Sequence, residues 1–169
     1  MGDAEKDPLS RRPADIYIVL RYIAGMPHVS NAEYRALAAV RYRIRRFLIF
    51  SESAAREAGV EPQQHQLLLA IRGLPAGEAA TVTAVADRLQ IRNHSAVELV
   101  ARAARAGLVE RRIDSDDARR VALSLTGRGA KLLEMLSRGH RAELADAGGD
   151  LVAALRTLMR ATPSARARK

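Results

Sequence analysis

The strongest constraint on the fold is a pair of short helical patterns followed at once by a strand–turn–strand pattern. Thr83 suits the start of a helix that continues through Leu89, because a threonine side chain can cap backbone N–H groups. After a break at residues 90–93, a second helical pattern runs from about Asn93 and ends at Gly107. Two short helices joined by a tight turn predict a helix-turn-helix, whose second helix can enter the DNA major groove.

The segment after the second helix predicts a β-hairpin. Residues 108–113 and 119–126 have strand-like patterns, and the polar residues 114–118 between them are typical of a turn. A hairpin directly after a helix-turn-helix makes a winged helix. The short β-branched run 81–83 can pair with this hairpin as a minor third strand. The predicted fold is therefore mainly α with a small β-hairpin wing, of the α+β class.

A long amphipathic helix is predicted before the winged helix. Ser30 can cap a helix that continues to about Ala58, with apolar residues repeating at intervals of three and four on one face. Pro62 then suits the first turn of a shorter helix that ends at Gly73, because the missing N–H of proline would have no partner there.

Two further helices are predicted after the hairpin. Helical patterns cover residues 129–145 and 151–159, and Gly148 and Gly149 between them predict a break. These helices cannot bury their apolar faces against the small winged helix alone. They indicate a further surface of contact.

Positive charge is concentrated in the predicted winged helix. The chain carries 28 lysines and arginines against 19 acidic residues, which gives a net charge of +9. Residues 88–131 hold 10 basic and 5 acidic side chains and so supply +5 of this charge. This concentration favours a nucleic acid as the partner. The arginine run over residues 35–46 fits either a solvated helix face or contacts with phosphate.

Several classes of site have no support in the sequence. The chain has no cysteine, which excludes disulfides and thiolate metal ligands. We find no phosphate-binding glycine loop, metal-binding histidine motif or nucleophile elbow, so we expect no enzyme, no metal and no cofactor. No apolar run approaches the roughly 20 residues of a membrane span and no signal peptide is visible, which predicts no membrane partner and a cytoplasmic location.

Four short motifs resemble the MarR family of bacterial transcription regulators. They are residues 84–89, 106–111, 114–120 and 123–129. The most specific part is Asp117-Ala118-Arg119, which matches the family's Asp-x-Arg signature, followed by the Leu-Thr-x-x-Gly start of the next helix. The resemblance covers residues 33–161 in the order of elements and implies a regulator that binds double-stranded DNA.

The resemblance also implies roles for individual residues. In the family an arginine at the wing tip enters the minor groove, which implies that Arg119 reads this groove and that Asp117 orients it. A solvated hairpin tip with a surface ion pair is the structural alternative. Side chains at the start of the second helix can read base edges, but Ser95 and Glu98 also fit a capping box. The full set of DNA-binding candidates is Arg92, Asn93, His94, Ser95, Glu98, Arg102, Arg112, Asp117, Arg119 and Arg120.

A homodimer and a small-molecule effector are implied in the same way. In the family the terminal helices of two protomers interleave, which places two recognition helices over a pseudo-palindromic site. Many members leave DNA when they bind a small aromatic or phenolic ligand. The candidates for such a ligand, by position along the helices, are Tyr34, Tyr42, His65 and Arg72. For His65 an ordinary polar helix start is the stronger alternative.

Three regions are expected along the chain. Residues 1–13 form a flexible leader. Residues 14–58, whose first apolar run favours a short additional helix, combine with residues 127–163 in a helical dimerisation region, and residues 59–126 form the winged helix-turn-helix DNA-binding domain. The expected function is a transcriptional regulator, most commonly a repressor in this family. A dimer of the same fold that binds a ligand or a protein without specific DNA binding is the alternative.

Overall fold

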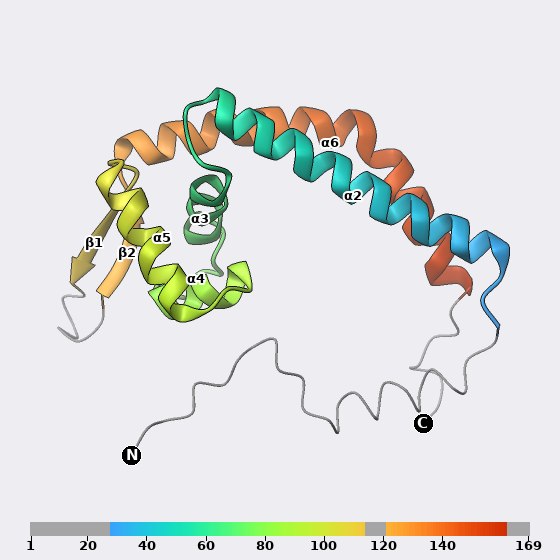
Figure 1. Ribbon diagram of the computed structural model, residues 1–169, viewed down its shortest axis with the longest axis horizontal. Helices are drawn as coiled ribbons and strands as arrows, with labels where there is room; N and C mark the ends of the chain where they lie inside the picture. Colours follow the sequence, from blue (N-terminus) through green and yellow to red (C-terminus); the bar gives the residue numbers. More distant parts are fainter. Residues whose placement is uncertain (1–27, 114–120, 162–169) are drawn as a thin grey trace, which may run out of the picture.

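Two long helices lie side by side and form a helical arm (Figure 1). They are α2 (Asn31–Glu57) and α6 (Gly127–Ala161). The remaining elements lie together at one end of this arm and are α3 (Pro62–Arg72), α4 (Val82–Leu89), α5 (Asn93–Arg105), β1 (Val109–Ile113) and β2 (Val121–Leu125). The predicted fold class, mainly helical with a small antiparallel hairpin, is confirmed.

The computed structural model describes residues 28–113 and 121–161. The expected leader, the expected short helix within residues 14–24 and the wing residues 114–120 lie outside the described residues.

The start of α2 shows why this helix begins where the sequence predicts. Ser30 is the N-cap, and its hydroxyl accepts a hydrogen bond from the backbone N–H of Glu33 at 3.2 Å. In return, the backbone N–H of Ser30 donates to Oε2 of Glu33 at 2.8 Å. The Ser30 hydroxyl also donates to this oxygen at 2.7 Å, and the two bonds to Oε2, the backbone one first, lower the pKa of Glu33. The reciprocal pair is a capping box, which satisfies N–H groups that a helix leaves open at its first turn.

The predicted break in the last helix is wrong. Gly148 and Gly149 lie within α6, which continues without interruption to Ala161. Each interior glycine costs a helix about 1 kcal/mol relative to alanine, and packing along α2 offsets this cost. Directly after the glycines, Asp150 accepts a hydrogen bond from the guanidinium of Arg43 on α2, which ties the two helices together at this point.

The start of α4 also differs from the prediction. The N-cap is Thr81, not Thr83, and its hydroxyl accepts from the N–H of Ala84 at 3.1 Å. The expected third strand over residues 81–83 is absent from the described sheet because Val82 and Thr83 already belong to the helix. Just before α4, one main-chain hydrogen bond still joins this segment to β2: the N–H of Leu123 donates to the carbonyl of Ala80 at 2.7 Å.

One hydrophobic core joins the winged helix to the arm. Leu133 and Leu136, from the first half of α6, are buried together with residues from the helices and strands of the winged helix. The largest fully buried side chains of this core are Leu67, Leu68, Val85, Val100 and Leu108. The core therefore fixes α5 and the hairpin relative to the base of the arm.

Candidate DNA-binding surface

The turn between α4 and α5 is short because Gln90 takes a left-handed conformation. Gln90 has a φ of 53°, and its side-chain amide donates to the carbonyl of Asp87 at 2.6 Å. The N–H of Ile91 donates back to the carbonyl of Ala86 at 3.0 Å. α5 then begins at Asn93, which gives the two helices the tight connection of a helix-turn-helix.

The buried face of α5 determines which side chains face outward. Its buried residues are Ala96, Leu99, Val100 and Ala103. On the opposite face His94, Glu98 and Arg105 are exposed and follow one another at helical spacing. A basic, an acidic and an imidazole side chain thus form one outward stripe that runs from the first to the last turn of the helix.

The first turn of α5 is open to an anion or to water. Arg92 is the N-cap residue, and its side chain makes no capping hydrogen bond. Asn93 and His94 follow it and are exposed. Uncapped N–H groups at a helix start can donate to a DNA phosphate. The predicted capping box of Ser95 and Glu98 is wrong, because the helix has already begun at Asn93 and Ser95 lies half-buried inside it.

Arg102 points away from this stripe. Its Nη2 atom lies 3.5 Å from Oε1 of Gln63 on α3. It also lines a hollow with Glu52 and Arg56 from the end of α2. The side chain of Arg102 therefore lies toward α3 and the end of α2, and not toward the outward stripe of α5.

Val97 is an apolar residue on the surface of α5. Its side chain is 44% exposed, one turn after Asn93. An exposed aliphatic side chain on a recognition helix can contact the methyl group of thymine. The sequence spacing indicates this exposure, because residue 97 does not lie on the helix face formed by the buried residues 96, 99, 100 and 103.

The hairpin is held against the helices by its backbone. β1 and β2 are antiparallel, with Arg112 opposite Ala122 and Ile113 opposite Val121. The N–H of Thr126 donates to the carbonyl of Leu108 at 3.1 Å. Among the predicted wing residues, Arg112 belongs to β1, whereas Asp117, Arg119 and Arg120 lie outside the described residues.

The joint between α5, the hairpin and α6 depends on close backbone approach. The Thr126 hydroxyl donates to the carbonyl of Gly107 at 2.7 Å and accepts from the N–H of Gly129 at 3.0 Å. Arg128 donates to the carbonyl of Ala106 at 3.1 Å. A Cβ atom on Gly129 would lie only 2.1 Å from the carbonyl oxygen of Leu108. The Leu-Thr-x-x-Gly motif thus has a structural role at this joint.

The four predicted ligand-binding residues lie in three different settings. Tyr34 and Tyr42 are exposed on α2. Arg72, at the end of α3, lines a hollow bounded also by β2 and α6, with Lys131 on its far side. His65 is buried in α3, and burial followed by the charge of His140 lowers its pKa.

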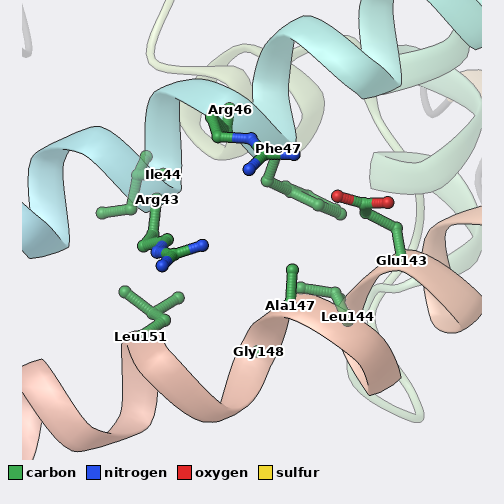
Figure 2. Close-up of a pocket in the computed structure, with 9 residues that line it drawn as sticks. All are labelled: Arg43, Ile44, Arg46, Phe47, Glu143, Leu144, Ala147, Gly148 and Leu151. Carbon is green, nitrogen blue, oxygen red and sulfur yellow. The ribbon is translucent and has the colours of Figure 1, made fainter.

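A further cavity lies between α2 and α6 of the arm (Figure 2). Phe47 of α2 points toward α6, where Leu144, Ala147 and Leu151 form the facing wall. The remaining lining residues are Arg43, Ile44, Arg46, Glu143 and Gly148. Because its walls are almost entirely apolar, this cavity suits an apolar group.

Two kinds of site are missing from the described part of the chain. Residues 28–113 and 121–161 contain no group of three or more histidine or acidic side chains placed to hold a metal ion. None of their helices combines the length and apolar character that a bilayer span requires.

The comparison with protein families agrees with this geometry. Residues 58–120, from the end of α2 to the wing, match the model of the MarR family. The chain carries a MarR-type winged helix-turn-helix. A search of curated proteins found no match.

Solved structures of MarR regulators share the fold. One MarR family transcription regulator has 23% sequence identity and a TM-score of 0.62, over 87% of this chain and 91% of that chain. AbsC from Streptomyces coelicolor has 17% identity and a TM-score of 0.59, over 75% and 84%. A mutant of MepR from S. aureus bound to an oligodeoxyribonucleotide has 18% identity and a TM-score of 0.53, over 71% and 92%. The predicted MarR resemblance is confirmed.

Proposed function

We propose that this MarR-type protein is a transcriptional regulator that binds a specific double-stranded DNA site as a homodimer. The observation that carries the proposal is the outward stripe of α5, where His94, Glu98 and Arg105 are exposed opposite a fully buried face. The MepR mutant bound to an oligodeoxyribonucleotide supports DNA as the ligand of this fold.

In the proposed complex α5 enters the major groove. Asn93 can pair with adenine, Glu98 can accept from the amino group of cytosine, and Val97 can contact thymine. The uncapped N–H groups after Arg92 are placed to meet a phosphate. From the family signature, Arg119 enters the minor groove beside it.

The homodimer is supported by the apolar surface of the arm. Leu155 of α6 is 41% exposed. Further exposed apolar residues of the arm are Leu37, Ile44, Leu48, Ile49, Leu144, Val152 and Met159. A large exposed apolar surface of this kind marks a protein contact. Burial of two arms against each other would present two α5 helices about 34 Å apart.

Repression, and release by a small aromatic or phenolic ligand, complete the proposed regulatory cycle. The hollow beside Arg72 supports a ligand site, because it adjoins both β2 and α6. Footprinting with and without phenolic compounds, paired with a transcription reporter, tests the ligand and the direction of control.

A salt series of DNA binding tests the function itself. The probes are the DNA next to the protein's own coding region and a shuffled duplex of equal length. We expect affinity for both to fall steeply with salt, with a preference of at least about a thousandfold for the specific duplex. Equal affinity for the two duplexes would favour a ligand-binding or protein-binding dimer without specific DNA recognition.

Single substitutions assign the contacts. Arg119→Ala and Asn93→Ala should each weaken specific binding by about 5- to 150-fold, corresponding to about 1–3 kcal/mol. Asn93→Ala should also relax the preference at one base pair. Arg138→Ala is the matched control, because it removes the same charge as Arg119→Ala from an exposed position on α6 that has no proposed DNA contact. Unchanged affinity of the Arg119 variant in a gel shift would remove the minor-groove role.

A further inference from the structure

Two histidine rings stack at the place where α2, α3 and α6 meet. The ring centroids of His65 on α3 and His140 on α6 lie 4.9 Å apart, with an angle of 8° between the planes. Phe47 and Phe50 of α2 contact the His140 ring by edge-to-face packing, at 5.6 and 5.7 Å between centroids. His65 is 4% exposed and His140 is 8% exposed. One imidazole pair therefore connects the winged helix to both helices of the arm.

The polar atoms of this pair are incompletely satisfied. The Nε2 atoms of His65 and His140 are both buried, and neither has a hydrogen-bond partner. Nitrogen lone pairs lie in the ring plane, and the two planes are nearly parallel. They do not converge on one point, as they would have to for chelation of a metal ion. Stacking suits neutral rings, whereas a second proton on either ring would bury a positive charge while Nε2 has no hydrogen-bond partner.

No carboxylate in the described chain forms an ion pair with either ring. Charged positions near the stack along the three helices are Arg46 on α2, Glu61 one turn before His65, and Arg138, Arg141 and Glu143 around His140. Arg138 and Arg141 are exposed. Glu61 caps α3 through Gln64, and Glu143 lines the arm cavity with Arg46. The pKa of His65 is lowered first by its burial and then by the charge of His140.

We propose that the His65–His140 stack is a proton-sensitive joint between the winged helix and the arm. In its neutral form the stack holds α3 against α6. As the pH falls below about 6.5, the unfolded or opened chain binds a proton on His65 more readily than the closed structure does. Acid therefore weakens the joint. Its effect on DNA rests on the proposed function, because the joint positions α5 relative to the arm.

The first test follows the histidines of the wild-type protein by NMR between pH 8 and 5. His28 and His94 are exposed and serve as internal references. We expect His65 to titrate at lower pH than these references, and the backbone signals of α3 and α6 around the stack to shift in the same step. Titration of His65 together with the references, without movement of the backbone signals, would overturn the proposal.

A variant then separates the stack from general acid effects. The double substitution His65→Phe and His140→Phe keeps two aromatic rings and removes both titrating groups. Between pH 7.5 and 5.5, the unfolding equilibrium of the wild type should shift toward the unfolded chain by at least about threefold more than that of the variant. Equal shifts would contradict a role of the stack, and if the variant does not fold, the wild-type titration decides.

DNA binding is measured on the same two proteins at the same two pH values. The wild type should lose at least about fivefold more affinity at pH 5.5 than the variant does, since the variant lacks the protonation step. Equal losses would contradict coupling of the joint to α5. Failure of both proteins to bind DNA at pH 7.5 would instead contradict the proposed function, and the NMR and unfolding results would still decide the joint.

Discussion

Gly129 occupies a position where no other residue fits. Its Cα faces the backbone of Leu108, and an added Cβ would meet the Leu108 carbonyl oxygen at 2.1 Å and its carbonyl carbon at 3.0 Å. Both are main-chain atoms, so they cannot rotate away as a side chain would. Two positions earlier, an added Cβ on Gly127 has no neighbour within 4 Å.

Gly129→Ala should therefore destabilise the protein. We expect a loss of about 1–3 kcal/mol in the free energy of unfolding, because the start of α6 must shift away from β1 to relieve the overlap. Urea unfolding followed by circular dichroism measures the loss. Gly127→Ala is the control in the same turn of the helix, and an equal loss in both variants would show that close approach to Leu108 is not the cause.

For single residues, the sequence predicted which side chains are exposed better than it predicted which residues they contact. Asn93 and His94 are exposed as expected, because the turn chemistry before them fixes where α5 begins. The contact of Arg102 with Gln63 depends on packing between helices that are distant in sequence, so no local pattern indicates it. The stacking of His140 on His65 also joins helices that are distant in sequence, so no local pattern indicates it.

Among the elements, α6 shows how packing overrides local preference. Gly149 is exposed within this continuous helix, and a Cβ there would have no neighbour within 4 Å. Gly149→Ala should stabilise the protein by about 1 kcal/mol, because alanine loses less backbone entropy than glycine on entering a helix. Thermal unfolding measures the gain.

Gly107→Ala is a useful comparison for this substitution. Gly107 has a φ of 67°, a left-handed conformation that alanine adopts only at a cost, so this variant should lose stability where the α6 variant gains it. A loss in the Gly149 variant would mean that the glycine is needed where α6 meets another surface, as in a dimer.

Helix boundaries were predictable where a side chain caps the helix. The start of α2 was located correctly by Ser30 and Glu33, whose side chains satisfy open N–H groups at the helix start. The start of α3 was located correctly by Pro62, which has no N–H to satisfy. The start of α4 was misplaced because Thr81 and Thr83 are both competent caps. The choice between them depends on Ala80, whose carbonyl is held by the N–H of Leu123 in β2.

For the whole molecule, the exposed apolar face of the arm is the contact surface of the proposed homodimer. Leu155→Glu should raise the dissociation constant of the dimer at least about tenfold, since a carboxylate would have to be buried between two arms. Analytical ultracentrifugation across a concentration series measures it. Leu69→Glu on α3 is the control, because Leu69 is also exposed but lies outside the arm. An unchanged sedimentation profile of the Leu155 variant would place the dimer contact elsewhere.

The sequence could predict that these faces need a partner, but not how the arm is built. Apolar residues at helical spacing show that a face is buried or paired, whatever it packs against. The side-by-side course of α2 and α6 depends on contacts across about a hundred residues of chain, of which Arg43 with Asp150 is one. The winged helix was more predictable, because its elements are short and adjacent in sequence.

The bonds that connect the hairpin to Ala80 and Leu108 have a consequence for the operators that such a protein can accept. Main-chain hydrogen bonds join β2 and the residue after it to the segments on either side of the helix-turn-helix, which holds β2 and α5 in a fixed relation. In the proposed complex, the distance between the major-groove contacts of α5 and the minor-groove contacts of the wing is then fixed within each half-site. We expect natural target sites to tolerate a changed distance between their two halves more readily than an inserted base pair inside either half.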